Sequence, residues 1–108
     1  MNTDYIFFQN LAQEIPEIPG DSIISRTIYS EEKVKIVLFG FAPGQELSEH
    51  TASMPAILYF LSGEADLTLG NDYFTVQTGS LVHMSANLSH SVHARTPTTM
   101  LLLLLRNG

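Results

Sequence analysis

From Asp21 onward, hydrophobic and polar positions alternate over short stretches, and this pattern predicts an all-β protein. Residues 65–69, Ala-Asp-Leu-Thr-Leu, alternate with the period of two that a half-buried strand requires. Turn residues bound further apolar stretches, which we predict to be strands at 22–29, 34–41, 56–61, 73–77, 80–84, 90–94 and 99–106. Many short strands with a turn signal every eight to twelve residues or so are typical of a sandwich or barrel.

The first twenty residues have a different pattern. Residues 5–8 are apolar, residues 10–14 are expected to form a helical turn, and Pro16, Pro19 and Gly20 interrupt regular structure. We therefore divide the chain into an N-terminal arm, 1–20, and a β-barrel domain, 21–108. The arm is expected to pack on the domain or on a partner subunit.

The last predicted strand contains Met100 followed by five leucines and does not alternate. A strand that is apolar on both faces is covered on both faces. One face would fill the interior, so the arm or a second subunit must cover the other. Only 15% of the residues are charged, which favours the same interpretation, and we expect a homodimer.

Charge and composition exclude several classes of function. The net charge is −6 and the five basic residues are scattered, so binding to nucleic acid or to an anionic membrane is not expected. The absence of cysteine excludes disulfides, thiolate metal sites and thiol nucleophiles. The start of the chain lacks the features of a signal peptide, and the longest apolar run is too short to span a bilayer. We expect a cytoplasmic protein.

Two segments carry candidate chemistry and resemble the two motifs of the cupin superfamily. The first motif is a Gly, five residues, His-x-His, three or four residues, a Glu, six residues and a Gly; Gly44, His50 and Gly63 match it. The second is a Gly, five residues, Pro-x-Gly, two residues, a His, three residues and an Asn; Gly79 and His90 match it. The resemblance covers 34–105 and implies a small single-domain cupin, folded as a β-barrel or double-stranded jelly roll.

The chain departs from the motifs at the positions of metal ligands. The family's site has three histidines and one glutamate, and here Ala52 and Ala56 replace one histidine and the glutamate, while His50 and His90 remain. The second motif also carries Ser85, Asn87 and Ala94 in place of its Pro, Gly and Asn. Catalytic metal centres usually have about three protein ligands. Two imidazoles would hold a divalent transition metal weakly, unless another side chain joined them.

Two further histidines, His83 and His93, are the obvious candidates for a third metal ligand. His93 lies three residues from His90, so on a strand it points to the opposite face. His83 is a weak recruit, because the family's residue at that point tends to lie away from the ligand face. The alternative is that His50 and His90 are pocket histidines that bind no metal.

Alternation also predicts the lining of a ligand pocket. Ser48 and Glu46 share parity with His50, and Leu58 and Phe60 follow Ala56 if that residue points inward. Methionines adapt their shape, so a pocket that contains them suits a small apolar or mixed ligand. The predicted pocket consists of His50, His90, Met54, Leu58, Phe60, Met84 and Ser48.

These observations favour a non-catalytic barrel that binds a small molecule, or weakly a metal. The alternative is a metal-dependent cupin enzyme of the dioxygenase or isomerase type that uses His50 and His90. A third hypothesis is an interaction role through the last strand and the arm.

Arg26 follows Ile24 on one strand face: it is either a solvated residue at the rim or a buried cation that needs an anionic partner.

Overall fold

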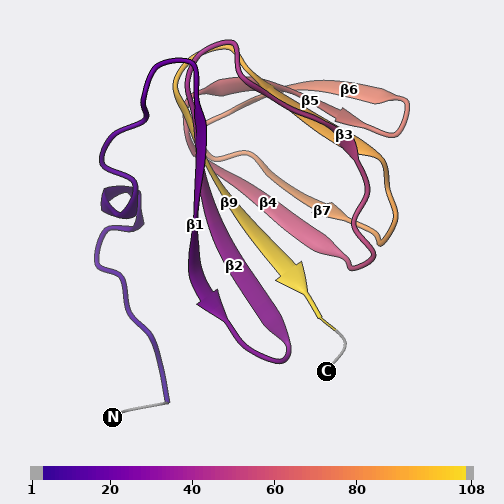
Figure 1. Cartoon of the computed structure of the whole chain (residues 1–108). Helices are drawn as coiled ribbons and strands as arrows, with labels where there is room; N and C mark the ends of the chain where they lie inside the picture. The colour runs from indigo at the N-terminus through magenta and orange to yellow at the C-terminus, as the bar shows by residue number, and fades with distance from the viewer. Residues whose placement is uncertain (1–3, 107–108) are drawn as a thin grey trace.

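The strands form two antiparallel sheets that enclose one core (Figure 1). The computed structural model describes residues 4–106. The five-stranded sheet contains, in spatial order, β1 (Ile23–Ser30), β2 (Val34–Phe41), β9 (Thr98–Leu105), β4 (Ala56–Ser62) and β7 (Leu81–Met84). The four-stranded sheet contains β3 (Glu46–His50), β8 (His90–Ala94), β5 (Glu64–Leu69) and β6 (Asp72–Gln77). This arrangement is a jelly roll, as the resemblance to the cupins implies, and the all-β prediction is confirmed.

Every predicted strand is present, with its ends displaced by one residue at most. One observed strand, β3, was not predicted. Its sequence, Glu-Leu-Ser-Glu-His, has a single apolar residue, and most of its side chains are exposed. A polar strand of this kind is held by pairing with its neighbour β8, so hydrophobic periodicity alone does not reveal it.

The core lies between the inward faces of the two sheets. On β4 the buried residues are Ala56, Leu58 and Phe60, which alternate with more exposed neighbours. On β5 the corresponding residues are Ala65 and Leu67. The remaining members of the core cluster come from other strands of both sheets: Phe41, Val76, Met84, Val92, Ala94 and Met100.

The central strand β9 is apolar on both faces, as its sequence predicts. Leu102 and Leu104 pack against the core. Leu101, Leu103 and Leu105 alternate with them and are only partly buried. The core therefore covers the inward leucines, Leu102 and Leu104. The outward leucines belong to a face of the sheet that is only partly covered.

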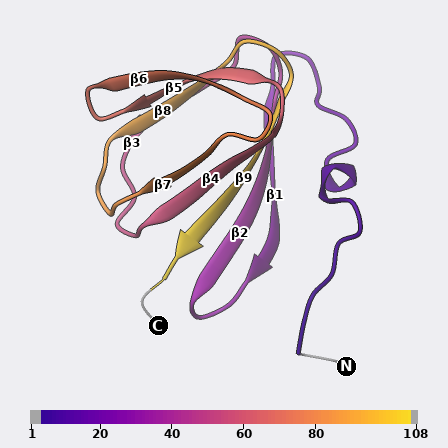
Figure 2. The same cartoon turned by 180° about the vertical axis from the view of Figure 1, so that it is seen from behind.

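The arm passes beside β1 and turns through a short 3-10 helix, η1 (Leu11–Glu14) (Figures 1 and 2). Ile15 and Ile18 lie so close to Gly40 of β2 that a Cβ built on this glycine would be 3.1 Å and 2.9 Å from their side chains. The guanidinium of Arg26 lies 2.9 Å from the carboxylate of Glu14. Arg26 is thus an exposed residue that holds the arm, and the buried-cation alternative is wrong.

The arm was predicted to begin at residue 1 and the barrel domain to end at residue 108; residues 1–3 and 107–108 lie outside the described part of the chain. Over residues 4–106, no helix has the length and apolar character needed to cross a membrane.

Gly63 allows a close approach between two backbone segments. It connects β4 to β5 with a φ of +92°, and a Cβ there would collide with the Pro97 carbonyl and lie 2.5 Å from Thr98 Oγ1. The neighbouring Glu64 N–H donates to Thr96 Oγ1 at 2.9 Å, and the buried Thr98 hydroxyl donates to the Thr96 carbonyl at 2.8 Å. The turn between β4 and β5 is therefore fixed against the start of β9.

Replacement of Gly63 by alanine should destabilise the fold strongly. Gly79 provides a matched control, because its φ is +94° and a Cβ at this position would meet no atom within 4 Å. Gly79→Ala should cost about 1 kcal/mol, the penalty of a left-handed alanine, and Gly63→Ala at least about 3 kcal/mol, because it adds a steric clash. Chemical denaturation of both variants measures the difference. Equal losses in the two variants would show that the contact with β9 does not restrict residue 63.

Candidate functional site

Two histidine rings lie against one another at one end of the barrel. His90 begins β8 and points inward with Val92 and Ala94, which leaves 6% of it exposed. His50 ends β3 and is directly opposite His90 in the β3–β8 pairing. The two ring centroids are 4.1 Å apart, and the ring planes are inclined by 58°. His50 is the more exposed of the pair.

Each ring has a defined hydrogen bond to the backbone. Nδ1 of His50 lies 2.8 Å from the Ser48 carbonyl, and Nδ1 of His90 lies 3.0 Å from the Leu88 carbonyl. A carbonyl oxygen only accepts, so each Nδ1 carries the proton and donates it. In the neutral imidazole the lone pair is then on Nε2. The pair thus presents two ring nitrogens that can accept a hydrogen bond or bind a cation.

A β-bulge places His50 in this position and changes the predicted pocket. The pairing register shifts between Leu47, opposite Val92, and His50, opposite His90. Leu47 packs toward the core. Because the bulge adds one residue to β3, His50 points to the same side of the sheet as Leu47, although the two are three residues apart. The predicted parity of Ser48 and Glu46 with His50 is wrong, because it assumed strict alternation. Ser48 contributes its carbonyl to the site, and its side chain is not part of the cavity lining.

The cavity beside His90 is small and mostly apolar. The loops that form it are joined by a 2.7 Å hydrogen bond from the Asn87 N–H to the Ala52 carbonyl. Its packing leaves no space for a water molecule. Leu58 and Phe60 belong to the core cluster and do not line it. The lining consists of Ala52, Met54, Ala56, Met84, Ser85, Leu88 and His90.

The other two histidines lie on the outer faces of the two sheets. His83 is exposed on β7, where it pairs with Ile57 of β4. His93 lies on the outer side of β8, opposite Glu46 and Asp66. Over residues 4–106, no group of three or more His, Cys, Asp or Glu side chains is arranged to hold a metal ion. The residues present therefore do not fit the four-ligand centre that the cupin motifs imply.

A second and larger cavity opens between the two edge strands β6 and β7. Its volume is about 340 Å³, within the range of small-molecule sites. No charged side chain lines it. The lining is Leu67, Leu69, Phe74, Thr75, Val76, Ser80, Leu81 and Val82. Sequence reasoning did not find this cleft, because it depends on which strands lie at the open edges of the two sheets.

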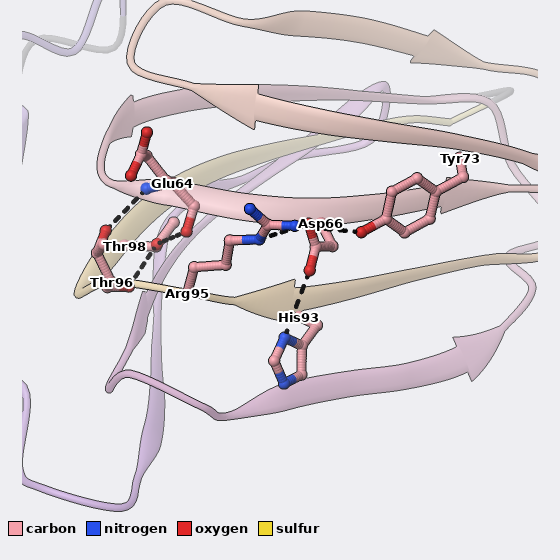
Figure 3. A network of polar contacts seen from close by, with 7 residues as sticks. All are labelled: Glu64, Asp66, Tyr73, His93, Arg95, Thr96 and Thr98. Atoms are coloured by element: carbon pink, nitrogen blue, oxygen red, sulfur yellow. Dashed lines mark hydrogen bonds and ion pairs between the residues drawn. The ribbon is translucent and has the colours of Figure 1, made fainter.

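A polar network on the outer side of the four-stranded sheet was also not predicted (Figure 3). Asp66 of β5 lies 2.8 Å from Arg95 Nε through Oδ1, and 3.8 Å from His93 Nδ1 through Oδ2. Arg95 also donates to the Tyr73 hydroxyl at 3.5 Å. The Arg95 contact holds the pKa of the Asp66 carboxyl below its usual value, with a smaller contribution from Tyr73 and against the opposing effect of burial. The network joins β5, β6 and β8 and lies on the opposite face of the four-stranded sheet from His90.

The fold and the two matching motifs are those of a known family. A family model described as "Cupin domain" matches residues 37–105, and the chain belongs to this family. No functionally curated protein matches the chain.

Solved structures agree with this assignment. A conserved protein of unknown function from Streptococcus pyogenes is 28% identical, with a TM-score of 0.85, over 100% of this chain and 94% of that one. A cupin superfamily protein from Desulfitobacterium hafniense is 25% identical, with a TM-score of 0.84, over 90% and 88% of the two chains. KdgF from Halomonas shares the fold, with a TM-score of 0.77 at 15% identity over 85% and 87%.

The Asp66 network should stabilise the protein only where the carboxylate is ionised. A lowered pKa in the folded state gives stability that is complete above the unfolded value of about 3.9 and lost as the pH falls through the folded value. Asp66→Asn should therefore cost up to about 1 kcal/mol at pH 7 and less near pH 2. Urea unfolding at both pH values measures this, with Asp72→Asn on β6 as the control. A loss of equal size at both pH values would contradict the electrostatic origin.

Proposed function

We propose that this cupin is a non-catalytic binding protein whose histidine pair holds the polar group of a small molecule. The observation that carries the proposal is the pair itself: two adjacent rings with both Nδ1 atoms bonded to carbonyls and both Nε2 atoms left to accept. The side chains at the positions of the missing ligands are Ala52 and Ala56, which can neither coordinate a metal nor transfer a proton.

The chemistry of the lining indicates the class of ligand. Apart from His90 and Ser85, the cavity is lined by Ala, Met and Leu side chains. A charged ligand would find no counter-ion among them. A small uncharged molecule with an apolar body and one hydrogen-bond donor fits better. Entry requires Met54 and Met84 to change rotamer, which their unbranched side chains allow.

Benzyl alcohol and toluene are suitable probes, because they share an apolar ring and differ in the hydroxyl donor. NMR titration of the full chain should show shifts of the His90 ring and of the Met54 and Met84 methyl groups. Benzyl alcohol should bind about three- to tenfold more tightly than toluene, the effect of one neutral hydrogen bond.

The variant His90→Ala should abolish the preference for benzyl alcohol, because His90 is the histidine that lines the cavity, and His83→Ala, which alters an exposed histidine on β7, should leave it intact. Shifts confined to Phe74, Val76 and Val82 would instead assign ligand binding to the cleft between β6 and β7 and overturn the role of the histidine pair.

A metal-dependent cupin enzyme is the second candidate. It is favoured by the two free Nε2 atoms, because ligating histidines usually donate their other ring nitrogen to a carbonyl or carboxylate. Only two such ligands are present, so we expect the wild-type chain to bind Zn²⁺ weakly. Restoration of the missing histidine provides a direct comparison, since Ala52 is partly exposed and lines the same cavity as His90.

Ala52→His should increase the Zn²⁺ affinity at least about tenfold, because it completes a three-histidine set of the kind found in catalytic zinc sites. Isothermal titration calorimetry measures the affinity, and Ser53→His, one residue away on the exposed loop, is the control. Stoichiometric, tight Zn²⁺ binding by the wild type that is lost in His50→Ala would favour the metalloenzyme over the binding protein.

A further inference from the structure

Two of the four edge strands within residues 4–106 are open to pairing with another strand. Proteins usually block an edge with a bulge, a proline, charged side chains or a covering segment. β1 has a bulge between Thr27 and Tyr29 and lies beside the arm (Figures 1 and 2). β3 has the bulge that precedes His50, and it carries two glutamates. Over their described lengths, β6 and β7 pair without a bulge and contain no proline, lysine or arginine.

The hydrogen bonds of Gln77 show which main-chain groups of β6 point away from the sheet. The Gln77 N–H donates to Ser80 Oγ at 3.1 Å, and its carbonyl accepts from the Ser80 N–H at 2.9 Å. Gln77 therefore faces away from β5. Alternate residues of a strand turn their main-chain groups to the same side, so Tyr73 and Thr75 face away from β5 as well. Within residues 4–106, no group pairs with these outward N–H and C=O groups.

β7 has a second open edge beside the same cleft. The Phe60 N–H donates to the Ser80 carbonyl at 2.9 Å, which turns the Ser80 carbonyl toward β4. By alternation, Leu81 and His83 turn their main-chain groups away from β4. The cleft of about 340 Å³ is lined by residues of both β6 and β7. Unpaired main-chain groups therefore lie along both of its borders.

Phe74 indicates what kind of side chain would enter the cleft. Val76 belongs to the core, so Phe74, two residues away, is on the same side of β6. There it lines the cleft and is 49% exposed. Residues opposite one another on paired strands point to the same side, so a residue paired with Phe74 would enter the cleft. Among the described residues, none of those that line the cleft is charged, and the entering side chain should be apolar.

We propose that β6 binds an extended segment of another protein as an additional antiparallel strand, with an aromatic side chain of that segment in the cleft. Main-chain hydrogen bonds to Tyr73 and Thr75 supply affinity, and the cleft selects the side chain, as in other cases of strand addition to a sheet edge. A small molecule in the cleft would leave the edge unpaired. The net charge of −6 and the exposed Asp72 at the start of β6 favour a segment with a basic residue.

The peptide acetyl-Thr-Val-Thr-Phe-Thr-Lys-amide is a suitable probe. In antiparallel register with β6, its phenylalanine is opposite Phe74, the threonines beside it are opposite Tyr73 and Thr75, and its lysine is opposite Asp72. NMR titration of the ¹⁵N-labelled full chain should give a dissociation constant below about 1 mM. Hydrogen exchange of the Tyr73 and Thr75 amides should slow on binding, because each gains an acceptor. Weaker binding, or unchanged exchange of both amides, would overturn the proposal.

N-methylation of single peptide residues separates strand pairing from burial of the aromatic ring. A methyl group on either threonine beside the phenylalanine removes an N–H that would donate to β6, and it should weaken binding at least about tenfold. A methyl group on the phenylalanine nitrogen alters an N–H that points away from β6, so binding should change less than about twofold. Equal effects at all three positions would show that the cleft binds the ring without strand pairing, and the proposal would then be wrong.

Thr75→Pro provides the corresponding test on the protein, with Thr75→Val as the matched control. Proline removes the outward N–H and leaves the pairing with β5 intact, as is usual for proline on an edge strand. Thr75→Pro should weaken probe binding at least about tenfold, and Thr75→Val should change it less than about twofold. Wild-type circular dichroism spectra of both variants would establish that the fold is kept.

Two results would contradict the role of this edge. One is equal binding of the probe by Thr75→Pro and the wild type. The other is slow exchange of the Tyr73 and Thr75 amides in the chain without peptide, which would mean that another copy already pairs with β6. Both measurements are independent of whether the histidine pair binds a ligand.

Discussion

The pairing of β9 between β2 and β4 is the constraint on which the rest of the structure depends. β9 forms a continuous register with β2 from Thr98 to Leu105 and lies beside β4 over most of the same length. Its inward side chains fill the centre of the barrel, and its outward leucines form the middle of the sheet's outer face. One strand therefore determines both the interior that supports the candidate site and the middle of the sheet's outer face.

The histidine site depends on a local irregularity within this regular frame. The bulge between Leu47 and His50 turns His50 to the same side as His90, although strict alternation from Leu47 would place it outside. The i−2 carbonyls then fix both rings in one tautomer. The pair occupies two of the ligand positions of the cupin motifs, and alanines stand at the other two. The cavity next to it is closed by side chains, whereas the open cleft lies at the other edge of the sheets.

Much of the fold could be predicted from local sequence, because alternation and turn residues report directly on strands with one buried face. Residues 65–69 and the closing leucine strand are clear cases. β3 has no such signal, because exposed polar residues of this kind form a strand only through pairing with β8. The residues of the histidine pair were found through their motif spacing. The bulge, the loss of Ser48 from the pocket and the contacts of Asp66 depend on three-dimensional register, which periodicity does not contain.

The position of β9 after both of its partner strands in the sequence has a consequence for the order of events during synthesis. β2 and β4 are made early, yet they are not neighbours: each pairs with β9, the last strand to be completed. Until residues 98–105 have emerged, both strands have an open edge, and no local hairpin can replace the missing partner. The five-stranded sheet can therefore be completed only after residues 98–105 have been made, and a chain cut short before this strand would keep two unpaired edges prone to association.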